Sequence, residues 1–326
     1  MKAIIQDGPG KLLYLKEVPT PEPGPDEVLI KMSYAPVNPS DLSFLQGTFA
    51  GRPDYPLIPG IEGSGMVVKS GRGIIGKLRK GKRVACTASG YRGGTWAEYM
   101  VTPAVRTIPL DKGISSEQGS MLFVNPLTAM AFINIANKYK CRTIVNNAAA
   151  SSLGRMLVFL CKKNNISLIN IVTRESQLKS LKEIGAGHIL ISDSPAFEDE
   201  LGSYSTRLDA KLFFDAVGGE QAEIMLRISP PGSILIPYAK LSEQDISIDS
   251  RILVQQNKKI EGFFLGNYTA QRSVLQNLAA IRKVKSMLSD DIKINVSAVF
   301  PLAEINEALD HYRRNMSEGK VLLRPY

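Results

Sequence analysis

Short apolar runs alternate with helical segments over the middle of the chain, from about residue 119 to residue 264. Several runs carry apolar residues at consecutive positions, which is typical of strands buried on both faces of a parallel sheet. Alternation of such strands with helices predicts an α/β fold, a doubly wound parallel sheet with helices on both faces. The predicted strands are Arg142–Asn147, Ser167–Thr173, His188–Ile191, Ala210–Asp215, Gly232–Pro237 and Lys259–Phe263, and the predicted helices are Leu153–Lys163, Glu175–Ile184 and Gly219–Ile228.

The regions before and after this alternating region have different sequence patterns. Before the alternating region, β-like runs are separated by clusters of Gly and Pro, which predicts a compact β-barrel. After it come a predicted helix near 269–288 and a final unit too small to bury a core alone, so we expect that unit to pack on the first lobe. The predicted domain boundaries are 1–120, 121–265 and 266–326. The β-like runs are Glu27–Met32, Gly65–Lys69, Arg83–Ala88 and Trp96–Val101, and the final unit comprises Val299–Phe300, Leu302–Arg314 and Lys320–Leu323.

The chain carries a formal net charge of +9, from 40 Lys and Arg against 31 Asp and Glu. An excess of this size fits a nucleic acid, an acidic membrane or a phosphorylated small molecule as a partner. The densest basic cluster, Lys77–Lys82, has no interleaved aromatic residue, so we predict a solvated turn there and keep nucleic-acid binding as the lesser alternative. A pocket for a multiply charged nucleotide accounts for the excess equally well.

No apolar run reaches the roughly 18 residues that a membrane-spanning helix needs, and we expect no membrane partner. The N-terminal residues lack the charged, apolar and small-residue regions of a signal peptide. The three cysteines, Cys86, Cys141 and Cys161, are odd in number and scattered, so no disulfide framework is predicted. The cytoplasm is therefore the expected compartment.

The loop between Asn147 and Leu153 consists entirely of small residues. A dinucleotide site needs such a loop between a strand and a helix, because small residues let the backbone approach a pyrophosphate and the helix N-terminus offers free N–H groups. The G-x-G-x-x-G pattern appears here as Ala149-x-Ser151-x-x-Gly154, with only the last glycine kept. Tight packing alone also produces small-residue turns, but the position between two predicted strands favours a dinucleotide site.

Arg174 follows the second predicted strand, about 20 residues after Gly154. Enzymes that use NAD usually have Asp or Glu at that place, bound to the ribose 2′-hydroxyl. A guanidinium can instead pair with a 2′-phosphate, which a carboxylate would repel. The adjacent Glu175 weakens this argument, and an ordinary exposed arginine at a strand end is the alternative. We predict a preference for NADPH.

A series of motifs runs in order along the whole chain. With the β lobe and the sheet, they make the chain resemble the medium-chain dehydrogenase/reductases of the zinc-independent branch, which contains quinone oxidoreductases and enoyl-thioester reductases. This resemblance implies a GroES-like first lobe completed by the C-terminal unit, a Rossmann domain and a homodimer. One match is partial, because relatives often have Asp where Lys82 stands. The motifs are Val37–Asp41 with Gln46–Gly47, Pro59–Gly65, Gly81–Val84, Gly94–Tyr99, Asn125–Ala129, Phe214–Gly219, Pro301–Ile305 and Glu318–Val321.

The resemblance also implies which residues would contact the cofactor and the substrate. Asn38 and Thr128 would lie on the nicotinamide side, and Thr173 and Arg174 would meet the adenosine phosphate. Plain core packing is the alternative for the apolar residues among the others. Those at the pyrophosphate would be Ala150, Ser151, Ser152, Leu153 and Gly154, those flanking the cofactor Val217, Tyr238, Phe263 and Leu265, and those of the substrate wall Phe49, Phe123 and Tyr238.

A zinc ion is not expected. By the resemblance, zinc-dependent relatives have Cys where Asn38 stands and His where Ile61 stands, which leaves only Glu62. A catalytic zinc needs about three protein ligands and a structural zinc about four, mostly Cys or His. The two histidines, His188 and His311, fall in the predicted sheet domain and the C-terminal helix, where packing or surface roles are expected.

Without a Lewis acid to polarise a carbonyl, we expect an activated acceptor, either a quinone or an alkene conjugated to a carbonyl. By the resemblance, enoyl-thioester reductases carry a proton-donating Tyr where Phe49 stands. Because Phe49 cannot donate a proton, quinone or enone reduction is favoured and the catalytic residue is left unassigned. Reduction of an enoyl thioester and a catalytically silent, nucleotide-binding assembly protein are the alternatives.

Overall fold

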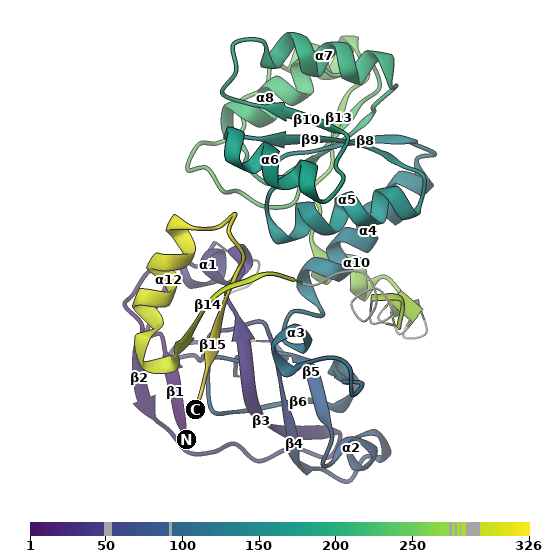
Figure 1. Cartoon of the computed structure of the whole chain (residues 1–326). Helices are drawn as coiled ribbons and strands as arrows, with labels where there is room; N and C mark the ends of the chain where they lie inside the picture. Colours follow the sequence, from purple (N-terminus) through teal and green to yellow (C-terminus); the bar gives the residue numbers. More distant parts are fainter. Residues whose placement is uncertain (49–53, 91–92, 274–275, 278, 281, 285–293) are drawn as a thin grey trace. The chain divides into compact units, whose positions relative to one another are not determined.

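The computed structural model describes residues 1–48, 54–90, 93–273, 276–277, 279–280, 282–284 and 294–326 of the 326-residue chain. It divides into two compact units, Met1–Val124 with Ile281–Tyr326, and Asn125–Ala280 (Figure 1). The second boundary lies after the predicted one at 265/266, because helix α10 (Leu265–Ala270) packs in the second unit, where Asn134 donates a hydrogen bond to the hydroxyl of Tyr268. The predicted helix near 269–288 falls partly outside the described residues.

The second unit is a six-stranded parallel sheet in the order β10-β9-β8-β11-β12-β13. The chain starts in the middle of the sheet, runs to one edge, returns to the middle and then runs to the other edge. This is the strand order of a Rossmann sheet, so the predicted doubly wound fold is confirmed. The strands are β8 (Thr143–Asn146), β9 (Ser167–Val172), β10 (His188–Ile191), β11 (Leu212–Asp215), β12 (Ile234–Pro237) and β13 (Lys259–Ile260).

Strand β11 shows why both faces of this sheet need cover. Phe213 points into the core that includes Leu201 and Met225 of α7 and α8, whereas Phe214 stacks on Phe132 of α4 at a centroid distance of 4.0 Å. Figure 1 shows α7 and α8 on one face, with α4 and α5 on the other. The helices of this unit are α4 (Val124–Lys138), α5 (Ser152–Lys163), α6 (Glu175–Glu183), α7 (Phe197–Arg207), α8 (Gly219–Ile228), α9 (Ser250–Gln255) and α10.

The first unit is built around β3, which pairs with β4, β6 and β15. The chain of pairings β14-β15-β3-β4-β5-β7 is antiparallel except between β14 and β15. Gly65 allows β4 to lie close to β3, because a Cβ there would come within 2.2 Å of the carbonyl oxygen of Lys31. The strands are β1 (Lys2–Ile5), β2 (Tyr14–Glu17), β3 (Glu27–Pro36), β4 (Glu62–Ser70), β5 (Arg83–Thr87), β6 (Tyr99–Pro103), β7 (Thr107–Pro109), β14 (Val296–Pro301) and β15 (Lys320–Arg324).

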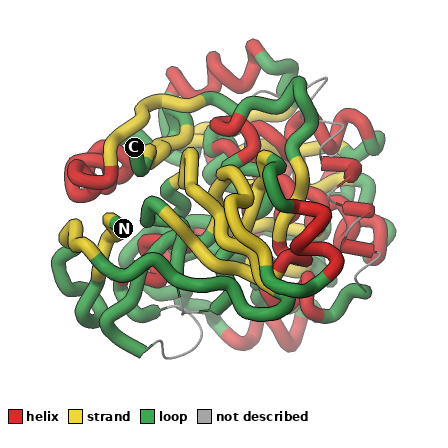
Figure 2. The backbone as a smooth tube through the Cα atoms, turned by 90° about the horizontal axis from the view of Figure 1, so that it is seen from below, coloured by secondary structure: helices red, strands yellow, loops and turns green. Residues whose placement is uncertain are grey.

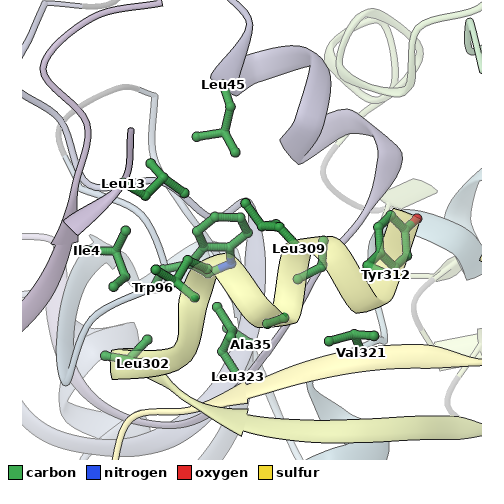
Figure 3. Packing of buried hydrophobic residues seen from close by; sticks show 13 residues of the cluster. Ile4, Leu13, Ala35, Leu45, Trp96, Leu302, Leu309, Tyr312, Val321 and Leu323 are labelled. Carbon is green, nitrogen blue, oxygen red and sulfur yellow. The ribbon is translucent and has the colours of Figure 1, made fainter. Parts of the chain in front are cut away.

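The C-terminal segment packs in the first unit. Strand β15 pairs with the end of β3, and helix α12 (Ile305–Arg314) covers a core whose centre is Trp96, the only tryptophan of the chain. In Figure 3, Leu309 lies close to the Trp96 indole while Ala35 and Leu323 approach from the strands. The short helices of this unit are α1 (Pro39–Leu45), α2 (Ile74–Arg79), α3 (Ser116–Gly119), η1 (Ala104–Arg106) and η2 (Leu302–Glu304).

The two chain ends lie close together (Figures 1 and 2). Both are held at Glu98: its carboxylate accepts from the backbone N–H of Lys2 at 2.8 Å, and its carbonyl accepts from the hydroxyl of Tyr326 at 3.2 Å. Within the described part of the chain, no helix has the length and apolar character needed to cross a bilayer.

The prediction of a plain turn at Lys77–Lys82 is wrong in part, because helix α2 covers Ile74–Arg79 and the turn follows it. Gly76 is the residue through which this helix packs on its neighbours. It is the buried residue of α2, and a Cβ there would lie 3.4 Å from side-chain atoms of Ser70 and Val28. The two glycines near the start of this segment read as turn formers in the sequence, which conceals the helix.

We expect Leu309→Ala to lower the free energy of unfolding of the first unit by about 2–5 kcal/mol, because it leaves a cavity beside a well-packed indole. Denaturant unfolding followed by Trp96 fluorescence reports this unit selectively. Leu12→Ala is the control, since Leu12 is 84% exposed and its truncation should change the free energy by less than about 0.5 kcal/mol. Equal effects of the two substitutions would contradict the packing described for α12.

Candidate functional site

The carboxyl ends of β8 and β11 meet in the middle of the second unit, where the strand order reverses. Ligands bind to sheets of this kind at that switch point. Here Asn147 donates to Asp215 at 2.5 Å and accepts from the N–H of Ala216 at 2.6 Å. The same Asp215 carboxylate accepts from the N–H groups of Val217 and Gly218, each at 3.0 Å. This network fixes the loop after β11 against the loop after β8.

Burial raises the pKa of Asp215, while the hydrogen bonds from Gly218, Asn147 and Val217 act in the opposite direction. The carboxylate has its donors supplied by the protein itself. We therefore assign Asp215 to holding the site together, since a ligand would find its oxygens already bonded.

The loop after β8 leads directly into the N-terminus of α5. Ser151 caps the helix by accepting from the N–H of Gly154 at 3.1 Å. The N–H groups of Ser152 and Leu153, in the first turn, have no partner within the helix, as at any helix N-terminus. A Cβ at Gly154 would lie 2.2 Å from the carbonyl oxygen of Ala149, so the helix can start this close to the strand only with glycine here.

Arg155 fixes the same loop from the helix side. Its Nε donates to the carbonyl oxygen of Ala150 at 3.1 Å, and its Nη2 donates to the hydroxyl of Ser180 on α6 at 2.9 Å. The backbone of the loop is thus held by both α5 and α6. Small side chains, free N–H groups and a fixed backbone are the features that a pyrophosphate site requires.

Thr173 and Arg174 lie just after β9, at the start of α6, and both are exposed. The side chain of Gln177 accepts from the N–H and hydroxyl of Thr173, at 3.0 and 3.1 Å. The guanidinium of Arg174 forms no ion pair within the described part of the chain, although Glu175 is its neighbour. A cation is therefore free at the place where the sequence predicts an adenosine phosphate.

Tyr238 follows β12 and joins a group of aromatic rings on the α4 face of the sheet. Its ring lies edge-on to Phe132, which also contacts Phe263. Its hydroxyl donates to the side-chain oxygen of Asn146 at 3.2 Å, and the amide nitrogen of Asn146 is buried without a partner. Burial raises the pKa of Tyr238 above its usual range, so the phenol stays protonated at neutral pH.

The first unit contains a second polar group, here called the Glu62 cluster, formed by Asn38, Asp41, Glu62 and Lys320. All four residues are at most 3% exposed. Asn38 donates from Nδ2 to Glu62 at 3.0 Å, and its side-chain oxygen accepts from the ammonium of Lys320. The other Glu62 oxygen accepts from the N–H groups of Phe123 and Val124, at 3.0 and 3.1 Å.

Asp41 completes the cluster at the start of α1. Its two oxygens accept from the N–H of Asn38 at 2.8 Å and from the N–H of Ile61 at 3.1 Å. Burial raises the pKa of Asp41 to about 7, against the opposing effect of the hydrogen bond from Asn38. Burial also raises the pKa of Glu62 and lowers that of Lys320, while the opposite charges of this pair act against both shifts.

This donor set does not suit a zinc ion. Ile61 has no ligating atom, and the side-chain oxygen of Asn38 accepts from the Lys320 ammonium, which would repel a metal cation. Among the described residues there is no group of three or more His, Cys, Asp and Glu that could hold a metal. His188 lies on β10 beside Tyr204, and His311 lies on α12 beside Phe300.

The structure places the predicted site residues in three groups. Ala150 and Ser151 with the first turn of α5 (Ser152–Gly154), and Val217 after β11, lie at the switch point, with Thr173 and Arg174 at the next strand end. Tyr238 and Phe263 join the ring group, Thr128 is buried in α4, and Leu265 begins α10. In the first unit, Asn38 belongs to the Glu62 cluster and Phe123 is buried beside it, whereas Phe49 lies outside the described residues.

The sequence did not predict roles for Asp41, Asp215, Asn147 or Lys320. A signal was present, because each of these polar residues stands next to buried apolar residues or inside a glycine-containing motif. A polar residue in such surroundings needs a buried partner. What the sequence could not give is which partner, since Lys320 is far from Asn38 along the chain.

Comparison with known proteins gives consistent results for the two units. Residues 24–112 match the model for an alcohol dehydrogenase GroES-like domain, and residues 184–323 match that for a zinc-binding dehydrogenase. The chain is 33% identical to a putative NADPH:quinone reductase from Mesorhizobium loti, with a TM-score of 0.92 and coverage of 100% of this chain and 98% of the other.

Two further relatives represent the two kinds of reductase. The mitochondrial enoyl-[acyl-carrier-protein] reductase of Xenopus tropicalis is 27% identical over 318 residues, which cover 96% of this chain and 89% of the relative. The Escherichia coli quinone oxidoreductase complexed with NADPH is 20% identical with a TM-score of 0.89, and each chain is covered completely. At 20% identity, the comparison with the Escherichia coli protein supports the fold alone.

We expect the stability of the first unit to fall as the pH rises from about 4 to about 7, because folded Asp41 keeps its proton in a range where the unfolded chain loses it. Its pKa is raised from 3.8 to about 7, which corresponds to a loss of at most about 4 kcal/mol. Asp41→Asn, which cannot titrate, should show a shallower decline in denaturant unfolding followed by Trp96 fluorescence. Burial acts on Glu62 in the same direction, so part of the decline should remain.

Asp54→Asn is the control, because Asp54 is an exposed aspartate of the same unit. Its pH profile should follow that of the unmodified chain. If Asp41→Asn retained the full decline, the buried carboxyl would not be the group that titrates.

Proposed function

Because the chain belongs to the medium-chain dehydrogenase/reductase family and is an oxidoreductase, we propose that it uses NADPH to reduce quinones or other carbonyl-conjugated compounds without zinc. The observation that carries the proposal is the small-residue loop and open helix N-terminus at the switch point, with Arg174 at the next strand end. When bound, the cofactor would supply a hydride from C4 of its nicotinamide.

In this proposal the backbone does most of the binding at the phosphates. The N–H groups of Ser152 and Leu153 would meet the pyrophosphate, which the loop Ala148–Ser152 admits because its side chains are small. Arg174 would pair with the 2′-phosphate, and Thr173 would offer its hydroxyl beside it. Val217, Phe263 and Leu265 would flank the cofactor.

The Glu62 cluster would serve by holding Asn38 in one orientation. Its amide oxygen faces the Lys320 ammonium and its amide nitrogen faces Glu62, so the two ends of the amide cannot exchange. With Thr128, Asn38 would position the nicotinamide. Fixed geometry of this kind contributes to catalysis by orienting the reacting groups, and it needs no proton transfer by the cluster.

The donor chemistry of the cluster leaves no Lewis acid for a simple ketone, which favours acceptors already activated by conjugation. Phe123 and Tyr238, with Phe49, would form the apolar wall for such an acceptor. The second candidate is an enoyl thioester, favoured by the names of several curated relatives. A nucleotide-binding assembly protein without turnover is the third.

A homodimer is also proposed, and the likeness to the family supports it. Strand β13 has two residues, of which Ile260 is exposed, and stands at the edge of the sheet, with exposed Phe264 following it in the chain. Such an edge can pair with a second copy. The cytoplasmic location stays a prediction, and several relatives are named as mitochondrial.

Titration of the full chain with NADPH and NADH, followed by nicotinamide fluorescence, tests the cofactor. A quinone and a short enoyl thioester then test the acceptor. We expect tighter binding of NADPH and faster turnover of the quinone. Faster reduction of the thioester would select the second candidate, and binding without turnover the third. If neither nucleotide bound, the proposed function would be wrong.

We expect Arg174→Gln to weaken NADPH binding by about 10- to 100-fold, as for loss of a charge-assisted hydrogen bond. Binding of NADH, which lacks the 2′-phosphate, should change little. Lys179→Gln is the matched control, because it removes one exposed positive charge from the same helix. A loss of affinity shared by both nucleotides, or by both variants, would remove Arg174 from this role.

A further inference from the structure

Helix α2 in the first unit packs in an unusual way, with a glycine inward and large aliphatic residues outward. Gly76 is buried, whereas Ile74 is 77% exposed, Leu78 59% and Ile75 42%. On a helix with 3.6 residues per turn, positions 74, 75 and 78 share one face and position 76 lies on the opposite one. Three branched aliphatic side chains therefore form one outward face.

Neighbouring elements extend this apolar surface. The 3-10 helix η1 contacts α2 and carries Val105, which is 62% exposed. Strand β4 also contacts α2, and its Met66 and Val68 are each more than a third exposed. Exposed aliphatic residues gathered on one helix and on the elements that it contacts indicate an interaction surface, whereas single ones do not.

The same surface is strongly basic. Between Lys69 and Glu98 the sequence contains no acidic residue. Arg72, Lys77, Lys80 and Lys82 are exposed, and none of them forms an ion pair within the part of the chain that the structure describes. The acidic residues on neighbouring segments include Asp26, whose carboxylate lies beside Gly73, Glu27 at the start of β3, and Glu22, which pairs with Lys69. These four basic residues and the aliphatic residues Ile74, Ile75, Leu78 and Val105 are called the α2 patch.

We propose that the α2 patch binds the surface of an anionic lipid bilayer. An apolar helix face bordered by lysines is the arrangement that lies in the headgroup region, with the aliphatic side chains inserted and the cations at the phosphates. A nucleic acid would use the cations and leave the isoleucines and the leucine exposed to water. A second copy of the chain would bring its own lysines against these lysines. Charge and apolar area together select the bilayer.

This proposal concerns contact with a membrane surface and is independent of the proposed reductase activity. It replaces the expectation of no membrane partner, which rested on the lack of a spanning segment. The sequence alone did not predict the patch, because the helix that groups its aliphatic residues was not predicted.

The test is co-sedimentation of the full chain with vesicles of phosphatidylcholine, with and without phosphatidylserine. We expect binding only when phosphatidylserine is present, and release as the salt concentration rises. The variant Lys77→Gln/Leu78→Ser/Lys80→Gln should lower the partition coefficient at least twentyfold, since each cation near an anionic surface accounts for about fivefold.

The matched control is Lys11→Gln/Leu12→Ser/Lys16→Gln, which likewise removes two lysines and one leucine from another exposed segment of the same unit. It should bind as the unmodified chain does. Equal losses in both variants would mean that binding follows total charge and would overturn the proposal. So would a lack of binding to phosphatidylserine vesicles.

Two further measurements test whether the α2 patch binds a second copy of the chain or a nucleic acid instead of a bilayer. Sedimentation velocity without vesicles would show a smaller species for the α2 variant if the patch joined two copies of the chain. A duplex oligonucleotide that binds the unmodified chain and not this variant, in the absence of vesicle binding, would assign the patch to nucleic acid. Either result would overturn the proposal.

Discussion

The carboxylate of Glu62 is the point on which the first unit depends. A buried carboxylate costs several kcal/mol in lost hydration unless donors and an opposite charge replace the water. Here the donors come from Asn38, Phe123 and Val124, and the charge comes from Lys320. Helix α1, strand β4, the start of α4 and strand β15 must all be in place before these groups can meet.

The second unit also holds its backbone in place with buried polar groups, but here they hold a loop. Its site needs a loop that stays open to a ligand, so the polar groups that stabilise it are set behind the loop. Asp215 and Asn147 join the two strand ends, and Arg155 holds the loop from the helix side. The N–H groups in the first turn of α5 have no partner within the helix. Both units thus use buried polar contacts to hold backbone segments in place.

The parts of the fold that the sequence predicted are those with a strong local pattern. The six strands of the sheet were predicted because short apolar runs alternate with helical segments and several runs are apolar on both faces, and α8 was predicted with its observed bounds, Gly219–Ile228. Elements with a weak pattern were not predicted, such as β2, which is exposed along its length, and α7, which has acidic residues in its first turn. The loop at Gly154 was found because its requirement for small residues is visible in the sequence. The Glu62 cluster was not found, because its members are brought together by pairing between strands remote in the sequence.

Strand β15 has a consequence for how the chain is made. It pairs with β3 and brings Lys320 to Asn38 and Glu62, yet it leaves the ribosome only after the second unit has done so. During synthesis, the end of β3 therefore stands as an open edge, and two acidic side chains wait without their cation while the whole Rossmann unit is translated. Domains generally fold as units as they emerge. The first unit therefore begins before the Rossmann unit and is completed after it, so a ribosome that stalls before β15 leaves a finished Rossmann unit attached to an unfinished barrel.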